Sequence, residues 1–110
     1  MEDLVAIKSS ESIEAVAARV STALGVALRP RESSYLGDPY FSGWPESDIK
    51  VTANLDPMFR EGDPAGERWF SSSASDAAYL VWETVDPVQA ATTLRAAGLD
   101  AAPASRRSRT

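Results

Sequence analysis

The chain contains neither cysteine nor histidine. Without cysteine it can form no disulfide, and it offers no thiol nucleophile or thiolate metal ligand. Without histidine it lacks the side chain that most often transfers protons near neutral pH and binds transition metals. An enzyme built from this sequence would depend on carboxylates, lysines, arginines, tyrosines or serines. We therefore expect a protein without enzymatic activity, cofactor or metal site.

The sequence also lacks long hydrophobic runs. None approaches the roughly 20 residues that a membrane helix requires. The first residues, MEDLVAIKSSES, have no basic region followed by a long apolar stretch, as a secretory signal would have. We therefore expect a cytoplasmic protein that does not contact membranes. A chain of this length can bury roughly two-thirds of its unfolded surface around one core. We expect a single α+β domain over residues 1–104 and a disordered basic tail over residues 105–110.

Acidic residues outnumber basic ones by 16 to 11, which gives a formal net charge of −5. Three of the basic residues, Arg106, Arg107 and Arg109, belong to the tail. Without them 8 basic residues remain against 16 acidic ones, so the body of the chain carries −8. Such a body repels nucleic-acid phosphates and anionic membranes and attracts a basic partner. The same acidity also suits a purely solubilising role, and the sequence leaves both interpretations open.

Two stretches each predict a strand followed by a helix and a terminating glycine. The first begins with DLVAIKSS, an apolar strand, and continues into ESIEAVAARVSTALG. Apolar residues of the second part fall at offsets of 0, 3, 4, 7 and 11, on one face of a helix: Ile13, Val16, Ala17, Val20 and Leu24. We expect Ser10 to cap the start of this helix and Gly25 to end it.

The second strand and helix come from AAYLVWETV and DPVQAATTLRAAGL. Asp86 stands at the predicted N-cap, and Pro87 takes the first helical position, where its missing N–H costs nothing. Gln89 occupies the position of a capping-box partner, and Gly98 ends the helix. The repeated order of strand, helix and glycine predicts two βαβ halves.

Strand patterns then predict the fold. LVAI and AYLVW are apolar throughout, as strands covered on both faces are. DIKVTANL alternates apolar and polar residues, so we expect Lys50, Thr52 and Asn54 to face water. SSYL and YFSGW flank the turn residues GDP, which predicts a hairpin. Together these patterns predict an α+β two-layer sandwich, a ferredoxin-like split βαβ with extra middle strands, in which two helices cover one face of an antiparallel sheet.

Residues 55–76, LDPMFREGDPAGERWFSSSASD, predict a long loop rich in turn residues. The loop carries aromatic residues and methionine, which disordered loops usually lack, so we expect it to dock on its own domain or on a partner. Protein interfaces favour aromatic and methionine anchors with charged residues at the rim. The partner-binding candidates are therefore Tyr40, Trp44, Asp56, Met58, Phe59, Glu61, Asp63, Glu67, Trp69 and Phe70. The same aromatic residues could instead complete the core under the loop.

The stretches ESSYLGDPYFSGW and DIKVTANLDP, in a short alanine-rich chain, resemble small actinobacterial proteins that include immunity proteins of polymorphic toxin systems. The resemblance covers roughly residues 5–85. It implies a cytoplasmic antidote that blocks one toxin domain by tight binding. Acidic immunity proteins commonly cover basic nuclease sites, so the implied partner is a basic protein and not a nucleic acid or a membrane. Our first interpretation is a protein-binding inhibitor.

A second stretch, AAYLVWETVDPVQAATTLRAAGLDAAP, is similar to the strand and helix that open a module of the vicinal oxygen chelate superfamily. The metal enzymes of this superfamily use His and Glu ligands, and histidine is absent here. The resemblance therefore implies a metal-free, dimeric member that sequesters a small molecule, such as an antibiotic, in an aromatic cleft. Its cleft candidates are Tyr40, Trp44, Trp69 and Trp82. An inhibitor should expose its aromatic residues on a flat or convex acidic face, whereas a sequestering protein should bury them around a concave pocket.

Overall fold

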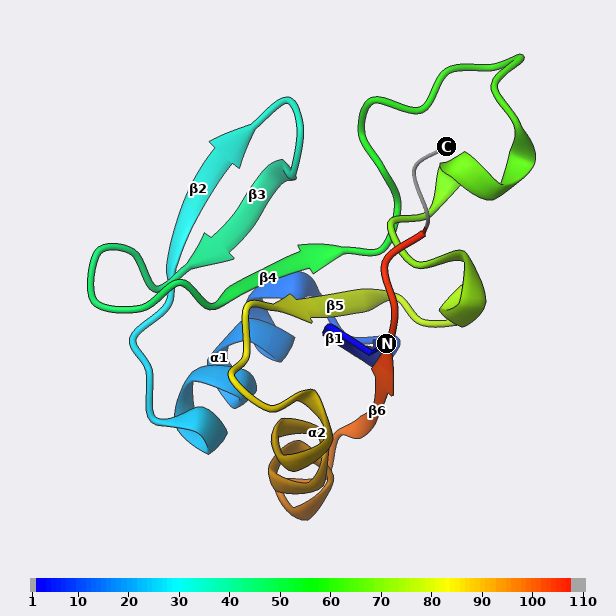
Figure 1. Ribbon diagram of the computed structural model, residues 1–110. Helices are drawn as coiled ribbons and strands as arrows, with labels where there is room; N and C mark the ends of the chain where they lie inside the picture. The colour runs from blue at the N-terminus through cyan, green and yellow to red at the C-terminus, as the bar shows by residue number, and fades with distance from the viewer. Residues whose placement is uncertain (1, 108–110) are drawn as a thin grey trace.

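The computed structural model describes residues 2–107 of the chain (Figure 1). The elements in chain order are β1 (Leu4–Lys8), α1 (Ile13–Leu24), β2 (Arg29–Ser33), β3 (Gly37–Ser42), β4 (Lys50–Ala53), the 3-10 helices η1 (Ala65–Arg68) and η2 (Ser72–Ala74), β5 (Tyr79–Trp82), α2 (Pro87–Ala96) and β6 (Asp100–Ala104). The strands form one antiparallel sheet in the order β2-β3-β4-β5-β1-β6. The predicted α+β class is confirmed. Strands β4, β5, β1 and β6 with the two helices make the ferredoxin-like split βαβ, and the β2–β3 hairpin supplies the extra middle strands.

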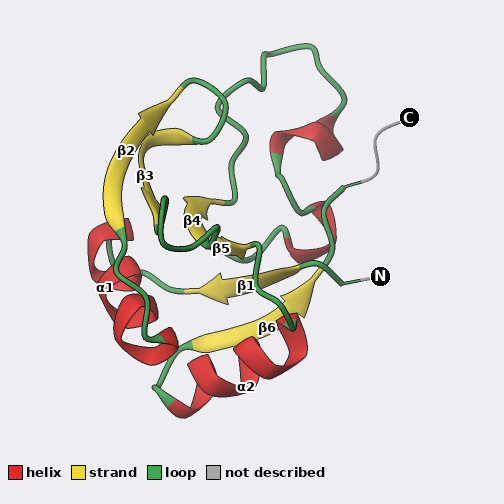
Figure 2. Ribbon diagram, turned by 60° about the vertical axis from the view of Figure 1, so that its left-hand side comes forward, coloured by secondary structure: helices red, strands yellow, loops and turns green. Residues whose placement is uncertain are grey.

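Both helices cover the same face of the sheet (Figure 2). The alternation of side chains along a strand sends Val5, Ile7 and Val81 to this face. There they pack against Val16 and Val20 of α1, and all five side chains are fully buried. Leu94 of α2 and Phe41 of β3 complete the same core. This layer is the main hydrophobic core that the two strand–helix patterns predict.

The helix ends follow the predicted signals, with one correction. Ser12, not Ser10, caps α1, because its side chain precedes the first helical residue and accepts the N–H of Ala15 at 3.2 Å. Gly25 closes this helix with a φ of 68°, the left-handed conformation that glycine adopts without strain. Asp86 caps α2 as predicted, by accepting the N–H of Gln89 at 3.1 Å.

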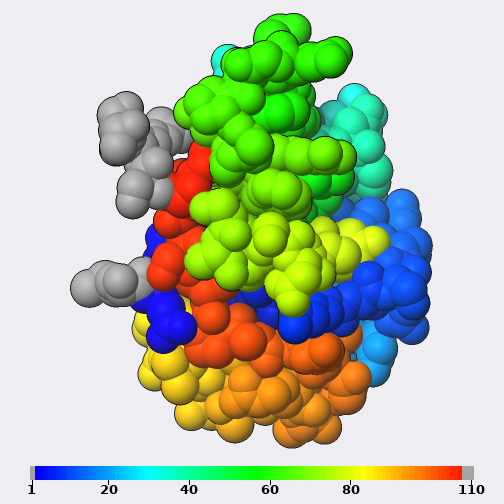
Figure 3. All heavy atoms as spheres, turned by 90° about the vertical axis from the view of Figure 1, so that its right-hand side faces the viewer, coloured from blue at the N-terminus to red at the C-terminus, as the bar shows by residue number. Residues whose placement is uncertain are grey.

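The opposite face of the sheet is covered by residues 55–77, which we call the covering segment. Leu4, Leu80 and Trp82 point to this face and are buried, and Phe70 and Ala74 of the covering segment pack against them. Figure 3 shows the covering segment and the C-terminal part of the chain side by side on this side of the molecule. The predicted long loop therefore docks on its own domain.

The prediction that Lys50, Thr52 and Asn54 face water is wrong for Thr52 and Asn54. Thr52 is 0% exposed and Asn54 is 1% exposed, whereas Lys50 is half-buried. The alternation itself is present, because Val51 faces the helices and Thr52 faces the other way. The buried hydroxyl of Thr52 is satisfied, because its Oγ1 accepts a hydrogen bond from the indole Nε1 of Trp82 at 2.8 Å.

The hairpin exists, but its turn is not at GDP. Residues 34–36 make the turn, and Gly37, Asp38 and Pro39 already belong to β3. The turn closes at Ser33, whose Oγ accepts the N–H groups of residues 35 and 36 at 3.1 and 3.2 Å. A register shift between Arg31 and Ser33 accommodates the displaced turn.

Residues 105–107, which belong to the predicted disordered tail, include two that form backbone hydrogen bonds with the rest of the domain. After β6 the chain passes beside the covering segment, where the N–H of Arg106 donates to the carboxylate of Asp3 at 3.0 Å. The N–H of Arg107 donates to the carbonyl of Phe70 at 2.9 Å. These two backbone hydrogen bonds hold a stretch whose composition suggested disorder. The remainder of the predicted tail, residues 108–110, lies outside the described residues.

Candidate ligand-binding cavity

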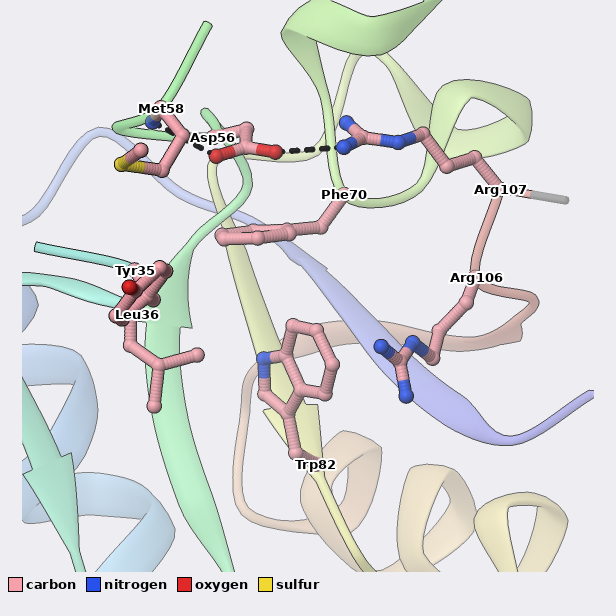
Figure 4. Close-up of a pocket in the computed structure, with 8 residues that line it drawn as sticks. All are labelled: Tyr35, Leu36, Asp56, Met58, Phe70, Trp82, Arg106 and Arg107. Atoms are coloured by element: carbon pink, nitrogen blue, oxygen red, sulfur yellow. Dashed lines mark hydrogen bonds and ion pairs between the residues drawn. The ribbon is translucent and has the colours of Figure 1, made fainter. Parts of the chain in front are cut away.

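A cavity of about 310 Å³ lies on the sheet face opposite the helices (Figure 4). It is enclosed by the β2–β3 turn, the covering segment, the end of β5 and the residues that follow β6. Its lining consists of Tyr35, Leu36, Asp56, Met58, Phe70, Trp82, Arg106 and Arg107. Segments far apart in the sequence thus meet around one hollow.

Aromatic rings form much of its wall. Trp82 at the end of β5 is held by the hydrogen bond from its indole N–H to Thr52. Phe70 meets the Trp82 ring edge to face, with centroids 5.2 Å apart and an interplanar angle of 82°. Tyr35 stands at the turn of the hairpin and is 69% exposed. The cavity therefore has a rigid aromatic floor and an exposed aromatic rim.

An ion pair crosses the cavity wall between the covering segment and the C-terminal residues. Arg107 Nη2 donates to Asp56 Oδ2 at 2.6 Å, and the other carboxylate oxygen of Asp56 accepts the N–H of Met58 at 2.8 Å. Arg107 Nη1 donates to the carbonyl oxygens of Trp69, at 2.8 Å, and of Glu67. The charges of this pair neutralise each other, and both groups are engaged in holding the wall.

Arg106 is placed differently. Its guanidinium carbon lies 4.9 Å from the centroid of the Trp82 ring, on the opposite side of the cavity from Tyr35 (Figure 4). Within residues 2–107, ion pairs join Lys8 to Asp76, Arg19 to Glu11 and Arg107 to Asp56, and none involves Arg106. The guanidinium of Arg106 thus reaches the cavity without a paired carboxylate among residues 2–107, and the same side chain borders a second hollow that Glu2, Asp3 and Glu83 also line.

Asn54 attaches the covering segment to the end of β4. Its side-chain Nδ2 donates to the carbonyl oxygens of Ala74 at 2.9 Å, Ala77 at 3.2 Å and Ser71 at 3.4 Å. Its Oδ1 accepts the N–H of Ser71 at 3.0 Å. Ser71 Oγ in turn donates to the carbonyl of Ser105 at 2.7 Å. One buried amide therefore links the end of β4, the covering segment and, through Ser71, the C-terminal residues.

The structure brings together only some of the candidate residues. Asp56, Met58 and Phe70 line the cavity, and Met58 is 43% exposed at its rim. Phe59 and Trp69 are half-buried within the covering segment. The exposed acidic residues of the same segment are Glu61, Asp63 and Glu67.

Tyr40 and Trp44 are not part of the cavity lining. Trp44, which is 58% exposed, belongs to the connection before β4, whereas the covering segment follows β4. The two therefore lie at opposite ends of that strand (Figure 1). Of the cleft candidates, Trp82 alone lines the cavity. Sequence reasoning missed Tyr35, although it lies in the aromatic stretch, and Arg106, which was assigned to the tail.

Two basic side chains of the strands share the sheet face that carries the cavity. Cross-strand pairing aligns Arg29 with Ser42, Ser42 with Lys50 and Lys50 with Trp82, so these side chains share the face that carries the cavity. The covering segment exposes Glu61, Asp63 and Glu67. Acidic residues are also exposed elsewhere on the domain, among them Glu11, Asp38, Glu46 and Glu83.

Perturbed titrations occur away from the cavity. Lys8 and Asp76 form an exposed ion pair at 2.8 Å, and the hydrogen bond from Lys8 lowers the pKa of Asp76 and raises that of Lys8. Burial, with a smaller contribution from Glu14, raises the pKa of Tyr79, whose hydroxyl donates to the carbonyl of Glu11 at 2.6 Å. The first contact links β1 to the covering segment and the second links β5 to the residues before α1. None of these groups lines the cavity.

Among residues 2–107, no group of three or more Asp and Glu side chains is arranged to hold a metal ion. Neither of the described helices has the length and apolar character needed to cross a membrane. Comparisons of the chain with protein-family models, with curated proteins and with solved structures return no match.

Proposed function

We propose that the protein is a non-enzymatic, cytoplasmic inhibitor that binds another protein through the rim of the cavity. The observation that carries this proposal is the exposure of two large apolar side chains, Tyr35 and Met58, at the edge of a hollow. Exposed apolar groups around a concavity, with charged groups outside them, are typical of protein interfaces. Here the outer charges include Glu61, Asp63 and Glu67 of the covering segment.

In this interpretation a side chain of the partner enters the cavity between Tyr35 and Met58, and the surrounding contacts exclude water from it. The covering segment is already held by Asn54 and by the Asp56–Arg107 pair, so binding needs little further ordering of the chain. The acidic residues steer a basic partner toward this edge. An immunity protein that neutralises a basic toxin domain, as the sequence resemblance implies, is the form of inhibitor that we propose.

The interface differs from the set of residues chosen from the sequence. The proposed interface uses Tyr35, Met58 and the acidic residues of the covering segment. Trp44 is outside it, because the length of β4 separates Trp44 from the covering segment. Trp44 is therefore a matched control, since it is a large exposed aromatic residue like Tyr35.

The test is capture of a partner from the native bacterial lysate with wild-type protein, a Tyr35→Ala/Met58→Ala double variant and Trp44→Ala. We expect a basic protein, retained in near-stoichiometric amount, to be lost in the double variant and kept with Trp44→Ala. Its purified activity should be inhibited by the wild type, and raised salt should weaken the complex. Equal retention by all three proteins, or a partner whose activity is unaffected, would refute the proposal.

Sequestration of a small molecule is a second candidate, favoured by the concave arrangement of Tyr35, Phe70 and Trp82. The cavity volume of about 310 Å³ is at the lower end of small-ligand sites, which span roughly 300–1,000 Å³. Native mass spectrometry of protein purified without denaturation would show a retained ligand as a discrete added mass. Loss of that mass in a Phe70→Ala variant, with retention in Trp44→Ala, is the expected result.

A further inference from the structure

We infer that the cavity binds a small, flat, apolar molecule that carries an anionic group, a carboxylate or a phosphate, and that Arg106 pairs with this group. The inference rests on the second candidate function, and it specifies the chemical class of ligand. It depends on which charged groups at the cavity are already engaged and which are not.

The two other charged groups of the lining are engaged. Both carboxylate oxygens of Asp56 accept hydrogen bonds, one from Arg107 and one from the backbone of Met58. The two terminal nitrogens of Arg107 donate to Asp56 and to two carbonyl oxygens. A ligand that used either group would have to break contacts that build the wall. The Asp56–Arg107 pair therefore contributes almost no net charge to the cavity.

Arg106 is the charged group of the lining that forms no ion pair within residues 2–107, and its side chain also borders a second hollow lined by Glu2, Asp3 and Glu83. Its guanidinium is near the face of the Trp82 ring, 4.9 Å from the centroid. A guanidinium that packs on an aromatic ring uses its flat face, so its N–H groups, which point outward in its plane, stay free to bind a carboxylate or phosphate in a bidentate manner.

The backbone on both sides of this side chain is fixed. The N–H of Arg106 binds Asp3, and the N–H of the next residue binds the carbonyl of Phe70. A cation held in this way loses less freedom on binding than one on a mobile segment, so more of the pairing energy appears as affinity.

The rest of the cavity suits an aromatic body. Phe70 and Trp82 stand edge to face, and Tyr35, Leu36 and Met58 complete an apolar enclosure (Figure 4). A flat ring system can contact these walls while a short acidic arm reaches Arg106. The guanidinium of Arg106 would repel a cationic ligand. The Asp56 carboxylate could not offset this repulsion, because it already pairs with Arg107.

The experiment measures binding of three molecules of nearly the same shape by isothermal titration calorimetry at low salt. They are indole-3-acetate, the neutral indole-3-acetamide and the cationic tryptamine. We expect indole-3-acetate to bind at least about tenfold more tightly than indole-3-acetamide, and tryptamine to bind most weakly, because a hydrogen bond to a charged group exceeds one to a neutral group. The indole N–H resonance of Trp82 should shift on binding.

Arg106→Gln should lower the affinity for indole-3-acetate to that for indole-3-acetamide and leave the latter unchanged. Arg60→Gln is the matched control, since Arg60 is exposed on the covering segment and does not line the cavity, and it should bind indole-3-acetate as the wild type does. Equal affinity of the wild type for the acid and the amide, or an unchanged affinity in Arg106→Gln, would overturn the inference while leaving sequestration in place. No binding of any of the three molecules would overturn both.

Discussion

Replacement of Asn54 by alanine tests whether one buried amide holds the covering segment in place. The side chain is 1% exposed and makes three hydrogen bonds of 2.9, 3.0 and 3.2 Å, besides a weak one of 3.4 Å. At about 1 kcal/mol for each of the three good hydrogen bonds, Asn54→Ala should lower the free energy of unfolding by about 3 kcal/mol. For a domain of this size the melting temperature should fall by roughly 10–15 °C.

The assay is urea unfolding followed by tryptophan fluorescence, with amide hydrogen exchange on the native protein. Exchange of the Ser71 amide should accelerate more than that of β1, because this amide donates to the Asn54 side-chain oxygen that the substitution removes. Thr92→Ala is the control, since the Thr92 hydroxyl is exposed on α2 and bonds within that helix, and it should change stability by less than about 0.5 kcal/mol. A loss below about 1 kcal/mol in Asn54→Ala, with unchanged exchange, would refute the role given to this amide.

Three further predictions concern other contacts. Asp56→Asn and Arg107→Gln should each lower the free energy of unfolding. Because the pair is only partly exposed, a double-mutant cycle from thermal melts should give a coupling energy of about 1 kcal/mol, and additive losses would contradict the pairing. Phe41→Ala should cost about 3–4 kcal/mol in chemical unfolding, as a core aromatic does, whereas the exposed Trp44→Ala should cost less than about 0.5 kcal/mol. Lys8 lowers the pKa of Asp76 in the folded protein, so the stability from this pair is present above the unfolded-state pKa near 4 and is lost as the pH falls through the lower folded pKa. Asp76→Asn should therefore flatten the plot of melting temperature against pH in that acid range. An unchanged plot would contradict the shift.

Elements that are encoded locally could be predicted from the sequence. Helix α2 follows directly from an Asp-Pro start and a glycine near its end, because an N-cap contact spans only three residues. The alternation in β4 correctly separated the two faces of that strand. Its exposure could not be predicted, because what buries Asn54 is a segment 17–23 residues further along the chain.

The cavity was only partly visible in the sequence for the same reason. Met58 and Phe70 were chosen because they stand out in a polar loop, and the structure places both in the lining. Arg106 carried no such signal, since a short basic stretch near proline and serine has the composition of a disordered tail. Its position depends on contacts with Asp3 and Trp82, which no local pattern encodes.

The position of β1 between β5 and β6 has a consequence for how this chain folds and how it can change. Val5 pairs with Val81 on one side and with Pro103 on the other, so the first strand has no neighbours until strands from the far end of the chain reach it. Such high contact order slows folding, and a cut between α1 and β5 would separate β1 from both of its partners. The entropy of closing a loop, by contrast, rises only slowly with its length. The stretch between α1 and β5 can therefore hold a hairpin and a long covering segment at little cost to the framework, and these two segments supply Tyr35, Leu36, Asp56, Met58 and Phe70 of the cavity lining.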